Sequence, residues 1–331
     1  MFNCSNWTPL HAKLHRTLRS RQLIKRNSSV LVALSGGQDS LCLIKLLLDL
    51  QPKWGWQLGI VHCDHRWRGD SQANANYVQQ LAKTWATKFY CATTEQPLKS
   101  EAEARQWRYQ ALSTIAQENN YTCIVTGHTQ SDRAETLLYN LIRGSGADGL
   151  QALTWKRSLA GVMLVRPLLE FSRAQTREFC QQQHLKVWED ATNQDLKYAR
   201  NRIRHDLLPY IQTHLNPQVE QALAQTAELL QAEVEYLEQA AYQLRQQATS
   251  LEDNSPEDIK LTINCRILQT APLALQRRAI RQLLQQVLPC NPSFEHIEKL
   301  TALITAPNNS RTEPFPGGVI AFVKNGWIYL K

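Results

Sequence analysis

The sequence predicts an α/β fold, in which a doubly wound parallel sheet is followed by a smaller, mainly helical domain that ends in a β-hairpin. Two observations indicate it. Short apolar runs alternate with helical stretches between residues 30 and 172, as in a parallel sheet with helices on both faces. After about residue 216 the alternation stops, and apolar residues recur at helical spacing. We therefore expect two domains, residues 1–216 and 217–331.

The expected strands of the first domain are short apolar runs, and a helix follows each of them. Residues 30–34 form a continuous, β-branched apolar run, which is typical of a buried parallel strand. Further strands are expected at 58–61, 89–92, 123–125 and 162–165, and helices at 41–50, 71–85 and 130–142. Another long helix opens at Ser100, which forms a capping box with Glu103, and Ser172 caps one more.

The second domain begins with a breaker-free amphipathic stretch, residues 217–247, which predicts one long helix. A loop is expected at 253–256, and helices at 273–288 and 296–304. Asn325-Gly326 lies between apolar residues, which is the signal of a type I′ hairpin turn. The chain therefore closes on two antiparallel strands.

Composition excludes several classes of protein. Apolar residues make up 43% of the 331-residue chain and charged residues 20%, a balance that excludes disorder. The most apolar stretch, 41–50, is too short for a membrane span and is interrupted by Lys45, so no membrane partner is expected. The net charge of +8 suits a polyanion such as nucleic acid.

The N-terminal segment is basic, because no acidic residue precedes Asp39. Six cations come before it: Lys13, Arg16, Arg19, Arg21, Lys25 and Arg26. An Arg-rich start can be an organelle transit peptide, but a basic amphipathic helix that leads into the first strand is favoured. None of the 8 cysteines forms a C-x-x-C pair, which favours a reducing, cytoplasmic location and no zinc site of common spacing.

The strongest local motif is Ser35-Gly36-Gly37-Gln38-Asp39-Ser40, which follows a predicted strand and opens a helix. Such a position binds ligands in doubly wound sheets. The glycines allow close approach of an anion, and the free N–H groups of the helix start favour phosphate. Asp39 would be repelled by phosphate, so its expected role is to hold Mg²⁺ there. The motif lacks the lysine of G-x-x-x-x-G-K-[ST], and it is not G-x-G-x-x-G.

This S-G-G-x-D-S motif resembles the PP-loop of the ATP-pyrophosphatase superfamily, which has an adenine nucleotide α-hydrolase-like fold. Three further segments resemble the tRNA(Ile)-lysidine synthetase family. They are the H-x-D-H-x-W-R run at 62–68, the run at 127–136 with L-I-R-G-S-G at 141–146, and D-A-T-N at 190–193 with Y-A-R-N-R-I-R at 198–204. Together they cover most of residues 29–209 in the family's order.

The resemblance implies a two-step reaction on RNA. In this family, ATP adenylates the C2 oxygen of the wobble cytidine, position 34, of tRNA(Ile) with a CAU anticodon. The ε-amine of free lysine then displaces AMP, which changes codon specificity from AUG to AUA. A urea-like carbonyl oxygen is a poor leaving group, so it must first become an adenylate. Charge develops on the phosphates, which calls for Mg²⁺ and cationic side chains.

The resemblance also implies roles for individual residues. ATP would bind Ser35, Gly36, Gly37, Gln38, Asp39, Ser40 and Arg105. Asp39, His62, His65 and Arg68 would be catalytic, and Asp39 would place Mg²⁺. Asp132 and Glu135, which lie on one helix face at this spacing, would bind the amino groups of lysine. Lys197, Arg200, Arg202 and Arg204 would bind tRNA, the first, second and fourth of them on one basic helix face. A homodimer is expected from the family.

Several positions depart from the family pattern. Ser131 replaces an aspartate, Arg133 a glutamine and Thr129 a frequent histidine, while Trp67 replaces a leucine. The lost acid and gained base predict an altered metal or lysine geometry. Two alternatives follow: a PP-loop tRNA-thiolating enzyme, for which only Cys63 lies near the site, and a non-catalytic RNA-binding protein with a decayed nucleotide site. A weaker RNA-contact candidate is Arg277, Arg278 and Arg281 in the second domain.

Overall fold

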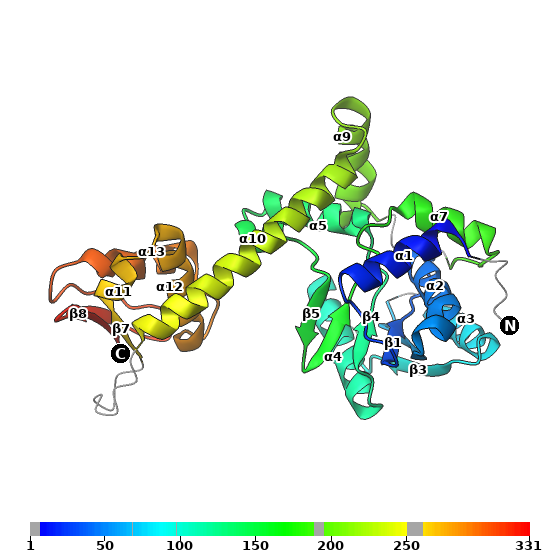
Figure 1. Cartoon of the computed structure of the whole chain (residues 1–331), viewed down its shortest axis with the longest axis horizontal. Coiled ribbons are helices and arrows are strands. Elements are labelled where there is room, and N and C mark those ends of the chain that lie inside the picture. Colours follow the sequence, from blue (N-terminus) through cyan, green and yellow to red (C-terminus); the bar gives the residue numbers. More distant parts are fainter. Residues whose placement is uncertain (1–6, 68, 97, 189–194, 250–260) are drawn as a thin grey trace. The chain divides into compact units, whose positions relative to one another are not determined.

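The computed structural model describes residues 7–67, 69–96, 98–188, 195–249 and 261–331 (Figure 1). The chain divides into two units, Met1–Gln231 and Ala232–Lys331, and each is described by itself. Helix α10 (Val219–Ala248) contributes its first part to unit 1 and its second part to unit 2. The predicted domain boundary near residue 216 stays a prediction.

Unit 1 is built on a six-stranded sheet in the order β3-β2-β1-β4-β6-β5. The strands are β1 (Ser29–Ala33), β2 (Gln57–Asp64), β3 (Lys88–Thr93), β4 (Cys123–Val125), β5 (Lys156–Leu159) and β6 (Val162–Val165). All neighbouring pairs are parallel except β5 and β6, which form an antiparallel pair at the edge. The predicted doubly wound parallel sheet is confirmed, with one antiparallel strand added.

The helices of unit 1 connect these strands. They are α1 (Pro9–Ser20), α2 (Gln38–Trp54), α3 (Ser71–Thr84), α4 (Glu101–Glu118), α5 (Gln130–Ile142), α6 (Ala147–Leu150), α7 (Arg173–Gln182), α8 (Ala199–Arg202) and α9 (Leu208–His214), with a π-helical turn η3 (Ile203–Leu207) before α9. The capping box predicted at the start of α4 forms, because Ser100 Oγ accepts a hydrogen bond from Glu103 N at 3.2 Å. Helix α7 begins at the predicted cap Ser172.

Two apolar cores lie on opposite faces of the sheet. In β1, Val30 and Val32 join the core formed with α1, α2, α3 and α7, whereas Leu31 joins the core formed with α4. This alternation is the two-residue period of a strand buried on both faces. Figure 1 shows α1, α2 and α7 gathered on one side of the strands.

The strand order determines where a ligand can bind. The chain proceeds outward from β1 to β2 and β3, and then returns to place β4 on the other side of β1. Such a reversal leaves a crevice outside the carboxyl ends of the two central strands. The segments that follow β1 and β4 both carry sequence motifs, the S-G-G-x-D-S loop at 35–40 and the segment at 127–136. The fold therefore brings these two motifs together.

Unit 2 is helical with a small antiparallel sheet. Its elements after α10 are β7 (Leu261–Asn264), α11 (Cys265–Gln269), α12 (Leu273–Val287), α13 (Phe294–Ala302), η4 (Leu303–Thr305), β8 (Ala321–Lys324) and β9 (Trp327–Leu330). The predicted hairpin is confirmed: Asn325 and Gly326 have φ values of 51° and 78°, as a type I′ turn requires. Strand β7, which the sequence did not predict, pairs with β9. The loop predicted at 253–256 lies outside the described residues.

Candidate active site

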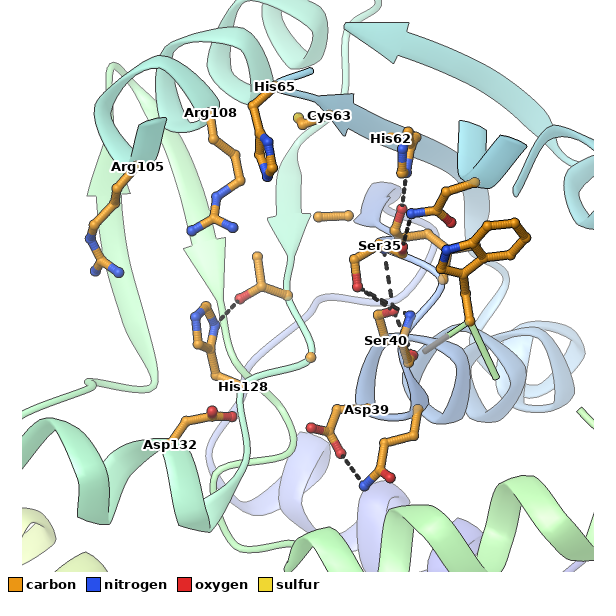
Figure 2. Close-up of a pocket in the computed structure, with 18 of the residues that line it drawn as sticks. Ser35, Asp39, Ser40, His62, Cys63, His65, Arg105, Arg108, His128 and Asp132 are labelled. Carbon is orange, nitrogen blue, oxygen red and sulfur yellow. Dashed lines mark hydrogen bonds between the residues drawn. The ribbon is translucent and has the colours of Figure 1, made fainter. Parts of the chain in front are cut away.

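A cavity of about 950 Å³ opens at the carboxyl ends of β1, β2 and β4 (Figure 2), and we call it the active-site cavity. Most of the residues predicted for ATP, catalysis and lysine line it. These are Ser35, Gly37, Gln38, Asp39, Ser40, His62, His65, Arg105, Asp132 and Glu135, together with Arg200 and Arg204. Gly36, Lys197 and Arg202 are not among its lining residues, and Arg68 lies outside the described residues.

The loop at the start of α2 is held in shape by its own hydroxyl groups. Gly37 N donates to Ser35 Oγ at 3.3 Å, and Ser40 Oγ donates to Gly37 O at 2.9 Å. Gly36 has a φ of +89°, and a Cβ there would lie 2.7 Å from Asn74 Oδ1, so a larger residue does not fit. Among the described residues no side chain caps the N-terminus of α2, which leaves its first N–H groups available to a phosphate.

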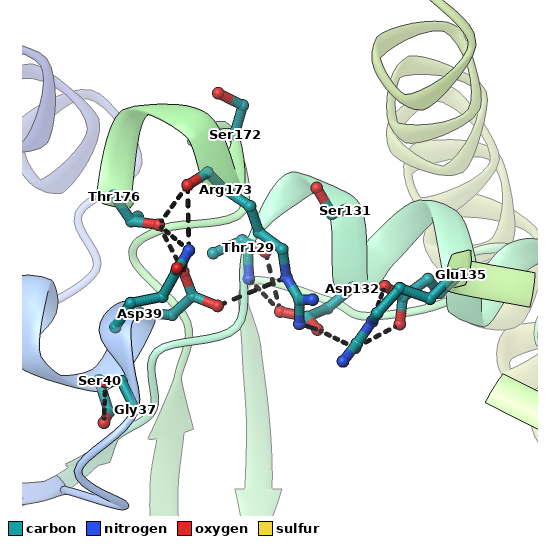
Figure 3. A network of polar contacts seen from close by, with 12 residues as sticks. Gly37, Asp39, Ser40, Thr129, Ser131, Asp132, Glu135, Ser172, Arg173 and Thr176 are labelled. Atoms are coloured by element: carbon teal, nitrogen blue, oxygen red, sulfur yellow. Dashed lines mark hydrogen bonds and ion pairs between the residues drawn. The ribbon is translucent and has the colours of Figure 1, made fainter. Parts of the chain in front are cut away.

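Asp39 stands at the first turn of α2 in a polar network (Figure 3). Thr176 Oγ1 donates to Asp39 Oδ1 at 2.5 Å, and Arg173 Nε lies 3.5 Å from Asp39 Oδ2. Burial, and then the nearby Asp132 carboxylate, raises the pKa of Asp39 above its ordinary value, and the cation and donors only partly offset this. A divalent cation bound at Asp39 would stabilise the ionised carboxylate against both burial and the repulsion by Asp132.

His62, on β2, and His65, just after the end of β2, line another wall of the cavity. His62 Nδ1 donates to Leu34 O at 2.8 Å, and burial lowers its pKa, so the ring is neutral near pH 7. Its proton is therefore on Nδ1, which leaves Nε2 as an acceptor. His65 packs its ring 4.8 Å from that of Trp67. Burial raises the pKa of the intervening Cys63 thiol to about 12, so this sulfur stays protonated and inert.

A third wall of the cavity is cationic. Arg105 and Arg108, from one face of α4, and Arg200, from α8, all line it (Figure 2 shows the first two). The guanidinium of Arg105 lies 5.0 Å from the centre of the Tyr109 ring. Burial, followed by the repulsion of neighbouring arginines, lowers the pKa of Arg105. Cations that repel one another beside a phosphate-binding loop are suited to the negative charge of a polyphosphate.

Asp132 and Glu135 lie on one face of α5, as predicted, and both are held by arginines (Figure 3). Arg204 binds Glu135 through two contacts of 2.7 Å and reaches Asp132 Oδ1 at 3.4 Å. Arg173 NH2 lies 3.1 Å from the same Asp132 oxygen. Burial opposes ionisation of Asp132, but Arg173, the backbone N–H of Thr129 and Arg204 outweigh it and lower its pKa. Asp132 therefore remains anionic, and both acids already contact cationic nitrogen atoms.

Of the residues that depart from the family pattern, Trp67 lines the cavity, whereas Ser131 and Arg133 are directed toward α10. Ser131 Oγ donates to Glu220 of α10 at 2.5 Å, and Arg133 NH1 donates to Glu228 of α10 at 2.5 Å. The Arg133 side chain is only 2% exposed. Thr129 donates twice to Asp132 and so caps α5. The new serine and arginine thus join α5 to α10 and place no charge in the cavity.

The predicted tRNA-binding residues separate into two groups. Lys197 is exposed, and Arg202 donates to the carbonyl oxygens of Leu196 and Lys197, which closes the turn before α8. Arg200 and Arg204 face the active-site cavity. Arg204 sits on the π-helical turn η3, a distortion that often marks a functional position.

In unit 2, the arginines singled out from the sequence are paired with acids. Arg277 binds Glu298 at 2.7 and 2.8 Å, while Arg278 and Arg281 both contact Glu238. These contacts indicate that the three arginines form ion pairs that stabilise unit 2. The seven described cysteines are free thiols, of which Cys91 and Cys290 are exposed. No described helix is long and apolar enough to cross a membrane.

Sequence reasoning missed Arg173 and Thr176, which contact Asp39 from α7. They follow the cap Ser172, but nothing in their spacing connects them with a loop more than 130 residues earlier. The same holds for Trp188, whose backbone N–H donates to Gly36 O at 3.0 Å. His128 lay within the recognised motif without an assigned role. Burial lowers its pKa to about 3, so it is neutral beside Asp132.

Comparison with known proteins decides the family. A PP-loop domain model matches residues 8–211, and a model described as the TilS substrate binding domain matches residues 264–329. The chain is 65% identical to a tRNA(Ile)-lysidine synthase from Nostoc sp., over 98% of this chain and 97% of that protein. The chain belongs to the tRNA(Ile)-lysidine synthase family. A relative of the same name from Synechocystis sp. is 50% identical over 97% of each chain.

More distant relatives agree. A chloroplastic tRNA(Ile)-lysidine synthase from Zygnema circumcarinatum is 35% identical over 91% of this chain and 81% of that protein. Among solved structures, a U34-tRNA thiolase from Methanococcus maripaludis that carries a [4Fe-4S] cluster aligns with a TM-score of 0.58. It is 15% identical over 67% of this chain and 78% of that one, so it shows a shared PP-loop fold alone.

Proposed function

We propose that this protein is an ATP-dependent ligase that makes lysidine at the wobble cytidine, position 34, of tRNA(Ile) with a CAU anticodon. The C2 oxygen of cytosine attacks the α-phosphorus of ATP and pyrophosphate leaves. The ε-amine of lysine then attacks C2 and AMP leaves with the oxygen. The product reads AUA in place of AUG. Family membership supports this reaction, and the active-site cavity offers residues for each half of it.

One observation carries the proposal, namely that a single arginine bridges the two halves of the site. Arg173 lies 3.5 Å from Asp39 of the phosphate loop and 3.1 Å from Asp132 of the acid pair. The Asp132 carboxylate is close enough to Asp39 to raise the pKa of Asp39. An adenylate formed beside Asp39 would therefore lie next to the groups proposed to hold the attacking amine. Proximity of this kind supplies much of the rate of a two-substrate reaction.

At the nucleotide end, the loop at 35–40 and the N-terminus of α2 are proposed to bind the phosphates, with Gln38 and Ser40 fixing the loop. Gln38 Nε2 bonds to Arg173 O at 3.0 Å, which ties the loop to α7. Arg105 is proposed to neutralise charge on the polyphosphate. His62 and His65, with Arg68 beyond the described residues, are proposed to contact the reacting phosphates from the end of β2.

Mg²⁺ is proposed to bind at Asp39 together with the substrate phosphates. Among the described residues no cluster of three or more histidine, cysteine or acidic side chains could hold a metal. A single buried carboxylate with a raised pKa fits a cation whose other ligands are phosphate oxygens and water. Bound there, the metal would neutralise charge on the phosphates as pyrophosphate leaves.

Asp132 and Glu135 are proposed to bind free lysine. Both Glu135 oxygens are engaged by Arg204, so the lysine ammonium group must share or displace that arginine. Lys197, Arg200, Arg202 and Arg204 are proposed to serve tRNA binding, with Lys197 exposed to solvent and Arg202 shaping the turn that presents it. The cytoplasmic location and the homodimer stay predictions from the sequence.

The reaction is tested by incubating the protein with ATP, Mg²⁺, lysine and unmodified tRNA(Ile) with a CAU anticodon. Mass spectrometry of the nucleosides should show a lysine adduct on cytidine in a one-to-one ratio with AMP. A sulfur adduct would indicate the thiolating alternative, and bound but unmodified tRNA would indicate a non-catalytic RNA-binding protein. Either result would overturn the proposal.

A further inference from the structure

The basic N-terminal segment separates into two groups in the structure. Lys13 and Arg21 contact two glutamates. Lys13 Nζ donates to the backbone oxygen of Glu170 at 2.7 Å, and Arg21 binds the carboxylates of Glu170 and Glu228 at 2.8 and 2.6 Å. Arg19, Lys25 and Arg26 take another direction. They surround a second hollow, and nothing in the proposed reaction uses them.

This hollow has a volume of about 590 Å³, and we call it the α1–α2 hollow. Its lining is His15, Leu18, Arg19, Gln22, Ile24, Lys25, Arg26, Lys53 and Trp54. These residues belong to the end of α1, the segment that leads into β1, and the end of α2. The hollow thus lies at the amino ends of the parallel strands, whereas the active-site cavity lies at their carboxyl ends.

The α1–α2 hollow is cationic without compensation. Its lining holds four cations and no aspartate or glutamate, and within the described parts of the chain none of these four forms an ion pair with an acid. The dipoles of α1 and α2 explain the positions of Arg19 and Lys53, which lie in the last turns of these two helices. They do not account for Lys25 and Arg26, which lie outside any helix. Like charges held together in a concave surface raise the local potential and attract anions.

His15 lies within this positive potential. Burial lowers its pKa, and Lys53, Arg19 and Arg26 lower it further. Trp54 Nε1 donates to His15 Nδ1 at 3.2 Å, so the neutral ring carries its proton on Nε2 and can donate to an anion there. The hollow therefore has a neutral donor in addition to its four cations.

The floor of the hollow is rigid and aromatic. Trp54 is buried and stacks on Trp56 with ring centres 5.0 Å apart. The Arg26 guanidinium lies 5.8 Å from the Trp54 ring, and Lys53 Nζ lies 5.2 Å from the ring of the exposed Trp7. Cations interleaved with aromatic rings are the pattern of surfaces that follow a nucleic-acid backbone.

We propose that the α1–α2 hollow is a second RNA-binding site, which holds backbone phosphates of the tRNA away from the reacting base. Its cations are exposed and distributed over three segments, an arrangement that fits successive phosphates of a polyanion better than one enclosed small anion. The inference rests on the proposed function only in taking tRNA as the polyanion.

Binding of full-length protein to unmodified tRNA(Ile) at several salt concentrations, without ATP or lysine, tests the site. The variant carries Lys25→Gln with Lys53→Gln, and the control carries Lys83→Gln with Lys88→Gln, two exposed lysines on α3 and β3. Each lost phosphate contact should reduce the slope of log affinity against log salt by about 0.7–0.9, so the variant slope should fall by about 1.5 and its affinity by roughly tenfold. Equal slopes for the variant, the control and the wild type would overturn the proposal.

A second measurement locates the contact. The pKa of His15, followed by NMR, should rise when tRNA binds, because phosphates offset the cations that lower it. The same experiment with inorganic phosphate distinguishes a small-anion site. If phosphate at millimolar concentration shifts His15 and tRNA does not, the RNA assignment is wrong. Neither measurement depends on lysidine formation, so failure of the proposed reaction and failure of this site are separable.

Discussion

The buried ion pair between Arg133 of α5 and Glu228 of α10 gives an asymmetric prediction. The Arg133 side chain is 2% exposed, whereas that of Glu228 is 33% exposed. Glu228 also accepts hydrogen bonds from Arg21 at 2.6 Å and Trp155 at 2.7 Å. Beyond Glu228, the guanidinium of Arg133 donates only a 3.2 Å contact to Gln231, among its described hydrogen bonds. Removal of the Glu228 carboxylate therefore leaves the buried Arg133 cation without its ion-pair partner, whereas removal of Arg133 leaves Glu228 with its other hydrogen-bond donors.

The magnitudes follow from that difference. Glu228→Gln should reduce the free energy of unfolding by about 3–4 kcal/mol, the range for an uncompensated buried charge. Arg133→Met should reduce it by about 1–2 kcal/mol, since one charged hydrogen bond is lost. The double variant should resemble Arg133→Met, which gives a coupling energy of about 3–4 kcal/mol. Arg21→Met, which removes two partly exposed ion pairs, serves as the control and should change stability by about 0–1 kcal/mol.

Thermal unfolding followed by tryptophan fluorescence measures this. Eight of the nine tryptophans lie in unit 1, so the signal reports the unit that contains the pair. For a unit of this size, the Tm of Glu228→Gln should fall by about 6–16 °C. Equal losses for Glu228→Gln and Arg133→Met, or strict additivity in the double variant, would refute the reasoning.

Three further predictions concern the active-site cavity. Asp39→Asn should stop formation of AMP from ATP, which chromatography of released AMP measures. It should also raise the Tm at neutral pH, measured by a thermal melt, because a carboxyl with a raised folded-state pKa destabilises the fold once it is ionised. Wild-type activity should likewise fall as pH drops through that raised pKa. Asp132→Ala should accumulate adenylated tRNA or raise the KM for lysine, seen by labelled ATP, and wild-type behaviour would contradict the lysine assignment. Gly36→Ala should raise the KM for ATP at least tenfold, because its Cβ would lie 2.7 Å from Asn74 Oδ1; an unchanged KM would show that the loop adapts.

The sequence predicted the strands and helices whose signals are local. Helix α5 was expected at 130–142 and is observed at Gln130–Ile142, because its cap and apolar spacing are both clear. Strands β5 and β7 were missed. Strand β5 has three exposed or polar positions at a sheet edge, and β7 is stabilised by pairing with β9 rather than by its own composition. Long-range pairing of this kind leaves no periodic signal in a short segment.

Sequence motifs placed most of the candidate site residues in one cavity, although their roles stay predictions. The loop at 35–40 apart from Gly36, together with His62, His65, Arg105 and the acid pair, lines one cavity, since motifs at the ends of neighbouring strands converge. Partners that come from remote helices were not predictable, as Arg173 and Thr176 show. The sequence also could not predict which way the side chains of Ser131 and Arg133 point. Their effect on charge could be counted, but their contacts with α10 depend on helix packing.

The free cysteines make the protein suitable for labelling without new thiols. Cys91 of β3 and Cys290, which follows α12, are exposed and lie in different units, whereas Cys42, Cys123, Cys180 and Cys265 are buried. Cys63 resists alkylation at neutral pH, since its pKa is about 12. With Cys4 replaced by serine, maleimide dyes should react at one position in each unit. Energy transfer between the two dyes would then report, in single molecules, any change in the spacing of the units when tRNA binds.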